Sequence, residues 1–368
     1  MADVPPLEPP SIHAALAKHN NPALSAALER GDPVGALSYE VALKGFAAPL
    51  HVAALRGDAE AVRQLLRHKA PVGSRVQRQS KPSAEDEEAG ATPLYLAAHG
   101  GHLETVRALL VARPDGYARC HGRTALYAAG YNGHAAVCTA LLQHGCNPNS
   151  QPADGDGATA LIAASEGGHA DAARALLSMD TRYTATRRAD LRLARTDGAS
   201  ALWAAAAANY AGLVTLLCER GVDCDQPNGA GESPAFAAAQ LGAVEALRAL
   251  SALGADLARP RFDGATPFWI GCRCGQAAAV EFLVEVLASV PSEAQVAGWT
   301  PYAIASKHAL LPVLRVLRGL GVNERAVLAA NDDCTRALRA GVSASAATVR
   351  APPEPVAPPR CSPPRLTH

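Results

Sequence analysis

The sequence predicts an all-α solenoid, a row of short helix pairs stacked one on the next. One short pattern recurs eight times along the 368 residues, with starts at Ala48, Thr92, Thr124, Thr159, Ser200, Ser233, Thr266 and Thr300. The starts are separated by 44, 32, 35, 41, 33, 33 and 34 residues, and a period of this length is typical of repeat architectures. An apolar stripe with helical spacing lies between successive starts, and one unit of this size cannot bury such a stripe alone.

Each unit is expected to contain two helices. The short pattern predicts the first helix, and in six copies a glycine nine residues after the start ends it. The second helix is predicted by apolar residues three and four apart, as in Val106, Leu109 and Leu110. In seven copies another glycine lies two residues before the start, and glycine readily takes the positive φ that a tight turn needs.

These residues resemble the ankyrin repeat, whose hallmark is Thr-Pro-Leu-His-x-Ala-Ala at a period of about 33 residues. The copy from Thr92 to Ala98 follows this hallmark at every position except the histidine. The resemblance covers roughly residues 33–341, and it implies an ankyrin-repeat solenoid of eight repeats with degenerate caps. The family pattern also accounts for histidines at helix starts, namely His51, His102, His134 and His169.

Departures from the period divide the chain further. The expected segments are a disordered N-terminus at 1–10, an N-terminal cap or degenerate repeat at 11–32, the array at 33–323 with insertions at 71–89 and 181–195, a C-terminal cap at 324–341 and a disordered proline-rich tail at 342–368. The two insertions correspond to the intervals of 44 and 41 residues. We expect the arginine-rich second insertion to lie outside the stack.

Charge and motifs argue against several classes of function. Lys plus Arg and Asp plus Glu both number 34, so the formal net charge is 0 and no global field favours nucleic acid. The sequence lacks a phosphate-binding Gly-Lys-Ser/Thr loop, a Gly-x-Ser-x-Gly elbow and a His-Glu-x-x-His zinc motif. Cys272 and Cys274 have no second pair at zinc-site spacing. We therefore expect no enzyme activity, no cofactor and no metal.

The sequence also bears on location. The longest apolar run, Ala201–Ala208, is far shorter than the roughly 18 residues of a membrane span. Residues 1–10 do not resemble a secretory signal, and nine cysteines are an odd number that suits a reducing compartment. We expect a soluble monomer of the cytoplasm, with the nucleus as an alternative, and no membrane partner.

The fourth position of the pattern departs from the family histidine. It is aromatic in six of the eight copies, although the chain has only 5 Phe, 3 Trp and 8 Tyr: Tyr95, Tyr127, Trp203, Phe236, Trp269 and Tyr302. These rings either stack from repeat to repeat as a buried ladder or line a binding surface. We favour the ladder, because the family histidine at this position is partly buried between neighbours.

The resemblance implies that partners bind on the concave side, through hairpin tips and first helices. The candidate protein-binding residues at these positions are Arg123, Tyr131, Asn132, Glu166, Gln240, Phe262, Asp263, Arg273, Trp299 and Lys307. Phe262 and Trp299 are large apolar residues on consecutive hairpin tips and would act as anchors. Stacking should make them neighbours, with Arg273 between them.

The function that the resemblance implies is a non-catalytic scaffold for protein–protein interaction. An alternative is a substrate-recruiting adaptor or regulatory subunit of a modifying enzyme. Nucleic-acid binding through 181–195 is a third, less favoured hypothesis. In the tail, Pro355–Arg360 matches the Pro-x-x-Pro-x-Arg form that SH3 domains prefer, which predicts a partner of that type at 355–360.

Overall fold

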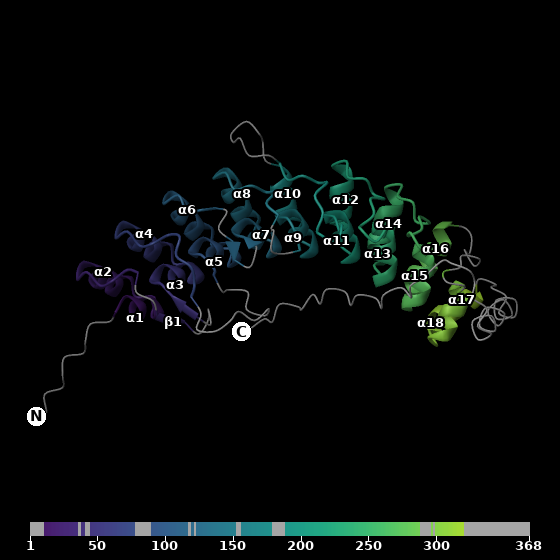
Figure 1. The fold of residues 1–368 in the computed structure, drawn as a ribbon, viewed down its shortest axis with the longest axis horizontal. Helices are drawn as coiled ribbons and strands as arrows, with labels where there is room; N and C mark the ends of the chain where they lie inside the picture. The colour runs from purple at the N-terminus through teal and green to yellow at the C-terminus, as the bar shows by residue number, and fades with distance from the viewer. Residues whose placement is uncertain are drawn as a thin grey trace, which may run out of the picture.

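The computed structural model describes residues 11–35, 38–40, 45–77, 90–116, 119–120, 123–151, 156–178, 188–287, 296 and 299–319. Within these residues, nine pairs of short α-helices stack one after another into an elongated arc (Figure 1). The prediction of an all-α solenoid is confirmed. The expected segments at 1–10, 324–341 and 342–368, with the motif at 355–360, lie outside the described residues.

The first helices of the pairs lie on the inner side of the arc from α1 to α15 (Figure 1). They are α1 (Ile12–Ala17), α3 (Pro49–Arg56), α5 (Pro93–His99), α7 (Ala125–Tyr131), α9 (Ala160–Glu166), α11 (Ala201–Ala207), α13 (Pro234–Leu241), α15 (Pro267–Cys274) and α17 (Pro301–Lys307). We call these the inner helices. Each packs on the second helix of its own pair and on the first helix of the next, as α7 does on α8 and α9.

The second helices form the outer layer of the arc. They are α2 (Asn21–Glu29), α4 (Ala59–Arg67), α6 (Leu103–Val111), α8 (Ala135–Gln143), α10 (Ala170–Ser178), α12 (Ala211–Glu219), α14 (Val244–Ala252), α16 (Ala277–Leu287) and α18 (Leu311–Gly319). Two short antiparallel hairpins accompany the helices. They pair β1 (Ser38–Glu40) with β2 (Gly45–Ala47) and β3 (Arg119–Cys120) with β4 (Arg123–Thr124).

The threonine or serine that opens the motif caps an inner helix. The Thr92 hydroxyl accepts the backbone N–H of Tyr95 at 3.3 Å, and the Thr266 hydroxyl accepts that of Trp269 at 3.2 Å. Such a bond satisfies one of the N–H groups that a helix start leaves without an intrahelical partner. In both copies the following proline occupies the first turn, where its missing N–H costs nothing.

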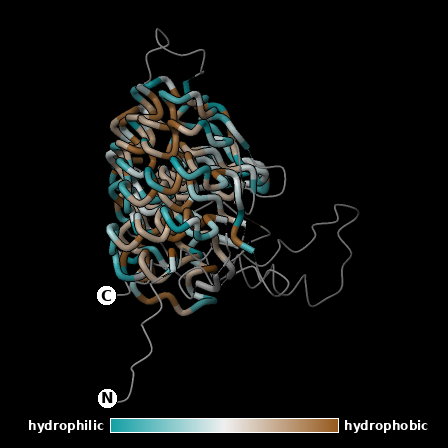
Figure 2. Tube along the Cα trace, turned by 90° about the vertical axis from the view of Figure 1, so that its left-hand side faces the viewer, coloured by the Kyte–Doolittle hydropathy of each residue, from teal (hydrophilic) through white to brown (hydrophobic). Residues whose placement is uncertain are grey.

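The core is a continuous apolar layer between the stacked helices. Alanines of the inner helices, such as Ala97 and Ala98, are fully buried, and so are stripe residues such as Val106 and Leu109. Hydrophobic and hydrophilic stretches accordingly alternate along the chain trace of the stacked pairs (Figure 2). Small side chains bring neighbouring inner helices close together, while the longer aliphatic residues fill the space between the two layers.

Consecutive pairs are also joined by hydrogen bonds at the starts of second helices. Nε2 of His102 lies 3.1 Å from the Leu55 carbonyl oxygen, and Nε2 of Gln276 donates to the Gln240 carbonyl at 3.2 Å. His102 occupies the space beside Gly57, which has φ 75° and where an added Cβ would lie 2.5 Å from the imidazole. The glycine that ends an inner helix therefore also makes room for the side chain of the next repeat.

His51 is a fully buried histidine whose tautomer is fixed by its two bonds. Nδ1 accepts the backbone N–H of Ala48 at 3.2 Å, so the proton is on Nε2, which donates to the Ser74 carbonyl at 3.0 Å. Burial lowers the pKa of His51 below its usual value. These bonds give it the structural role expected of the motif histidine.

We expect part of the acid sensitivity of the fold to come from His51. In the unfolded chain a histidine takes up a proton near pH 6.5, whereas the folded His51 resists protonation. Its contribution to stability is therefore present above about pH 6.5 and is lost as the pH falls toward its lower folded pKa. Urea unfolding midpoints at pH 7 and pH 5 should differ less in His51→Gln than in the parent. The control is His144→Gln, which changes an exposed histidine and should keep the pH dependence of the parent. If His51→Gln keeps it as well, this role of His51 is contradicted.

The second expected insertion is shorter than predicted. Residues 181–187 lie outside the described residues, but Arg188–Arg195 packs on the array, with Ala189 buried and Leu191 against the core. The Asn149 side chain holds the start of this segment with two hydrogen bonds. It donates to the Arg188 carbonyl at 3.0 Å and accepts the Asp190 N–H at 2.7 Å. The prediction that 181–195 lies wholly outside the stack was wrong, because its last eight residues are the ordinary connection between two repeats.

The first expected insertion also overlaps a connection. Residues 78–89 lie outside the described residues, whereas Val76 is buried and its N–H donates to the Ala91 carbonyl at 3.0 Å. Residues 71–77 thus belong to the repeat rather than to an inserted segment. At the N-terminal end of the array, α1 and α2 pack on α3 and α4 as one pair packs on the next.

Two further features concern location. None of the helices in the described ranges is long and apolar enough to cross a membrane. Cys218 of α12 and Cys224 in the connection that follows form a disulfide with Cα atoms 6.0 Å apart, while the described Cys138 and Cys272 are free and buried. Disulfides are uncommon in reducing compartments, so the expected cytoplasmic location stays a prediction.

Candidate protein-binding surface

A line of exposed side chains runs along the inner helices. The residue seven positions after each motif start forms this line, which we call the inner row: Leu55, His99, Tyr131, Glu166, Ala207, Gln240, Arg273 and Lys307. All eight are partly or fully exposed, whereas most motif residues before them are buried. Because the eight positions are equivalent in successive repeats, their side chains follow one another along the array. Half of the ten predicted site residues belong to this row.

The aromatic residues of the motif lie beneath the inner row. The ring centroids of Tyr95 and His99 are 6.3 Å apart, as are those of Tyr127 and Tyr131, and both pairs are stacked. Tyr95 and Tyr127 are only 4% and 5% exposed, so each supports a more exposed ring. Five of the six motif aromatics are buried as the expected ladder requires, but Trp203 is only partly buried. The two stacked pairs each join residues four apart on one helix, so they are not the repeat-to-repeat stacking that was expected.

Cations lie against several of the same aromatic rings. The Arg123 guanidinium carbon is 5.1 Å from the centroid of Tyr127, and that of Arg273 is 5.8 Å from the centroid of Trp269. Geometries of this kind are attractive cation–π contacts. The aromatic fourth position thus serves as a platform that holds charged and aromatic groups at the surface.

Arginines in two connections are enclosed by carboxylates. Arg195 Nη1 lies 2.5 Å from Glu166 Oε1, and Arg195 Nη2 lies 3.4 Å from Asp197 Oδ2. Arg261 Nη1 lies 3.1 Å from Glu232 Oε1, and Arg261 also pairs with Asp263. The arginine side chains are 16% and 19% exposed, so solvent screens these pairs less than it screens surface pairs. Both arginines therefore hold the array together and are not available to a partner.

The two clusters shift the pKa values of their carboxyl groups in opposite directions. Burial raises the pKa of Glu166, although Arg195 opposes the shift. The hydrogen bond from Arg261 lowers the pKa of Asp263, although burial opposes it. Glu166 and Asp263, both predicted as binding residues, are thus held by internal arginines.

Sequence reasoning missed Arg195 and Arg261 as parts of the surface. The sequence does contain a signal for them, a repeated Arg-x-Asp-Gly pattern. It occurs at Arg195–Gly198 and Arg261–Gly264, and each arginine lies five residues before a motif start. In both copies the aspartate side chain also accepts a backbone N–H two residues on, at 2.9 Å for Asp197 and 3.1 Å for Asp263. This repeated pattern positions the connection before each helix.

The two hairpin-tip aromatics have different surroundings. Phe262 is 82% exposed and its ring lies over Gly231 of the preceding connection, where an added Cβ would be 2.8 Å away. Trp299 is partly buried, its carbonyl accepts Nε1–H of Trp269 at 2.9 Å, and Lys307 Nζ lies 4.4 Å from its ring centroid. The placement of Phe262 and Trp299 as neighbouring anchors about one repeat apart stays a prediction. The described contacts group Trp299 with Lys307.

The remaining predicted residues have local roles. Asn132 Nδ2 donates to the Ala128 carbonyl at 3.0 Å and so caps the end of α7. The Gln240 carbonyl accepts the bond from Gln276, while the Gln240 side chain stays partly exposed in the inner row. Of the predicted set, Tyr131, Phe262, Asp263 and Lys307 are exposed, and the other six are partly buried.

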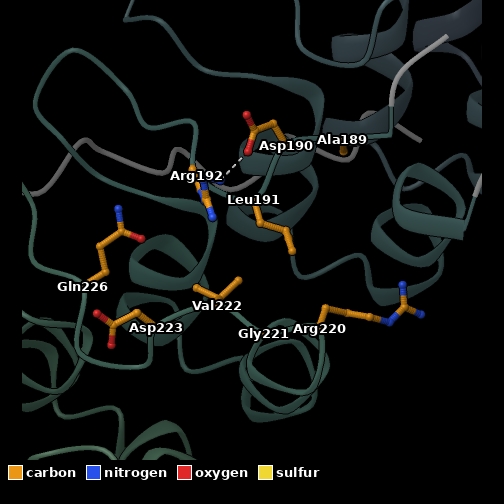
Figure 3. A pocket seen from close by; sticks show the side chains of 9 residues that line it. All are labelled: Ala189, Asp190, Leu191, Arg192, Arg220, Gly221, Val222, Asp223 and Gln226. Carbon is orange, nitrogen blue, oxygen red and sulfur yellow. Dashed lines mark hydrogen bonds between the residues drawn. The ribbon is translucent and has the colours of Figure 1, made fainter.

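A groove of about 630 Å³ lies away from the inner row, between the connections that follow α10 and α12 (Figure 3). Leu191 and Val222 line it, the exposed Arg192 lies between Leu191 and Gln226, and the exposed Arg220 points away from them. Its lining contains no serine, cysteine or histidine. Across the part of the chain that the structure describes, no three potential metal ligands cluster together.

Comparison with known proteins identifies the family. Residues 12–118, 50–152, 114–188 and 149–228 match the family model described as ankyrin repeats in three copies. The human ASB11 ankyrin repeat domain, a solved crystal structure, has a similar fold with a TM-score of 0.51 and 22% sequence identity, and the match covers 67% of this chain and 99% of that one. No curated protein matches the chain. With matches that together span residues 12–228, this chain belongs to the ankyrin repeat family.

Proposed function

We propose that this protein is a non-catalytic scaffold that binds partner proteins along its inner helices. The inner row and the neighbouring hairpin tips form the binding surface. The observation that carries the proposal is the inner row itself, a line of exposed side chains supported by buried aromatic rings. Ankyrin repeats typically mediate protein–protein interaction, and the matches contain no catalytic domain.

The physical chemistry of the row supports this role. Tyr131 is 41% exposed and Phe262 is 82% exposed, although solvated positions on helices and tips normally favour polar residues. Aromatic and arginine side chains dominate the energetics of protein interfaces. A rigid stack also presents them with little loss of conformational entropy on binding.

Truncating Trp299 should weaken the main partner without unfolding the array. Alanine keeps the backbone carbonyl that binds Trp269 but removes the ring beneath Lys307. We expect Trp299→Ala to lower affinity at least roughly 30-fold, about 2 kcal/mol, with a much smaller loss of melting temperature than a fully buried ring would cause. The partner is first captured from extract and identified by mass spectrometry. The affinity of the purified pair is then measured by calorimetry.

Two variants control this comparison. Leu311→Ala removes an apolar side chain that is 62% exposed on α18, outside the inner helices, and should bind like the parent. Trp269→Ala removes a ring that is 4% exposed and should lower stability instead. A folded Trp299→Ala protein that binds as well as the parent, or an equal loss in Leu311→Ala, would refute the proposed surface.

The adaptor hypothesis remains a second proposal without a structural observation of its own. It would use residues 324–341 or the motif at 355–360, and both lie outside the described residues. Nucleic-acid binding through 181–195 loses support, because Arg195 is committed to Glu166 and Asp197.

A further inference from the structure

We propose that the C-terminal end of the inner row, Arg273 with Lys307, binds an acidic segment of the partner protein. The proposal rests on the proposed function and assigns the chemistry of the partner at this end of the surface. It depends on three observations, namely the shared register of the two cations, their freedom from acidic neighbours and the indole rings that hold them.

The two cations are equivalent residues of adjacent repeats. Arg273 lies seven positions after Thr266, and Lys307 lies seven positions after Thr300. Their helices, α15 and α17, pack directly on each other. Since packed helices lie roughly 8–10 Å apart, the two charges should be separated by about that distance. A peptide in the polyproline II conformation has three residues per turn and advances about 3.1 Å per residue, so carboxylates three positions apart lie on one face, about 9 Å apart, and would meet both cations.

Both charges are unneutralised within the described residues. Neither Arg273 nor Lys307 forms an ion pair there, in contrast to Arg195 and Arg261, and α15 and α17 contain no acidic residue. An acidic ligand would therefore not have to displace an internal carboxylate. Opposite charge at an interface favours the right partner and speeds association.

Each cation is held by an indole ring. Arg273 lies 5.8 Å from the ring centroid of Trp269, and Lys307 lies 4.4 Å from that of Trp299. The contact to the ring face leaves N–H donors free for carboxylate oxygens. The indoles thus restrict two long side chains before binding, which reduces the entropy lost when a ligand pairs with them.

The positive charge is confined to this end of the row. The preceding members are Leu55, His99, Tyr131, Glu166, Ala207 and Gln240. Nucleic acid requires several phosphate contacts along a basic track, and two cations at one end do not supply one. A short run of glutamate or aspartate in a protein fits the spacing and the extent of the site better.

The test uses the full chain and a labelled short peptide with glutamate at every third position. A matched peptide carries glutamine at the same positions, and fluorescence anisotropy measures binding at low and moderate salt. We expect the parent to prefer the glutamate peptide and to lose that preference as salt rises. Equal binding of the two peptides, or no binding of either, would overturn the proposal.

Charge-reversal variants locate the site. Arg273→Glu with Lys307→Glu should weaken the glutamate peptide at least about tenfold. Arg192→Glu with Arg220→Glu makes the same charge change at two exposed arginines elsewhere and should have no effect. If the first variant melts early, Arg273→Gln with Lys307→Gln keeps the test valid and should also weaken binding. Equal losses at both sites would overturn the proposal, as would tighter binding of a single-stranded oligonucleotide through Arg273 and Lys307.

The captured partner separates this proposal from the proposed function. A partner that loses affinity for Trp299→Ala but binds the charge-reversal variant normally would leave the scaffold function intact and refute the acidic segment. A partner that binds Trp299→Ala as tightly as the parent would refute the scaffold surface itself. Loss of affinity in both variants would support both proposals.

Discussion

Replacing Leu141 and Leu142 together with alanine is expected to destabilise the array by about 4–10 kcal/mol, at 2–5 kcal/mol per site, with some departure from additivity for adjacent residues. Both side chains are at most 1% exposed. Their helix, α8, packs on α7, α6 and α10, so the two truncations open cavities at interfaces with three neighbours. Because each repeat contacts only its neighbours, the damaged centre should unfold separately from the ends.

Urea unfolding followed by circular dichroism checks this expectation. The parent and Gln143→Ala, which changes an exposed residue of the same helix, should unfold alike to within about 0.5 kcal/mol. The double variant should show more than one transition. A single cooperative transition with a loss below about 1 kcal/mol would contradict the view that these leucines join consecutive repeats.

Gly198→Ala should also be strongly destabilising, by about 2–6 kcal/mol. Gly198 has φ 81°, and an alanine Cβ there would lie 2.2 Å from the backbone nitrogen of Gly229. The strained backbone costs about 1–3 kcal/mol and overpacking about as much again. The Gly229 N–H donates to the Asp197 carbonyl at 2.9 Å, so this backbone cannot move away without losing a bond between two repeats.

Gly264 provides a matched control for Gly198. It occupies the equivalent position before a later motif start, has φ 83° and has nothing within 4 Å of an added Cβ. Gly264→Ala should therefore show only the cost of the left-handed backbone, measured as the shift in urea midpoint. Equal losses in the two variants would mean that the contact between the two connections contributes nothing.

The repeat frame could be predicted because its chemistry is local. A threonine or serine cap, a proline in the first turn and a left-handed glycine each act within a few residues, so the sequence displays them directly. The second insertion was placed wrongly because its interval of 41 residues exceeds the usual 33 by only eight, whereas 181–195 spans fifteen. Aligning Ala189–Leu191 with Ala255–Leu257, each eleven residues before a motif start, would have assigned Arg188–Arg195 to the connection.

The surface was predictable only in part. Inner-row members such as Tyr131 and Arg273 follow from their motif position, and their supporting rings lie four residues earlier on the same helix, a spacing that brings side chains together. The pairs of Arg195 with Glu166 and of Arg261 with Glu232 join residues 29 positions apart. Their contact depends on how one repeat stacks on another, and the motif alone does not specify it.

Hydrogen exchange of the complex with the purified partner tests the central claim most directly. If the partner binds along the inner row, backbone amides at the ends of α7, α15 and α17 and in the connection that carries Phe262 should exchange more slowly in the complex. Amides of the outer helices α14 and α16 should be unchanged. Protection confined to the outer helices, with the inner helices exchanging as in the free protein, would contradict the claim.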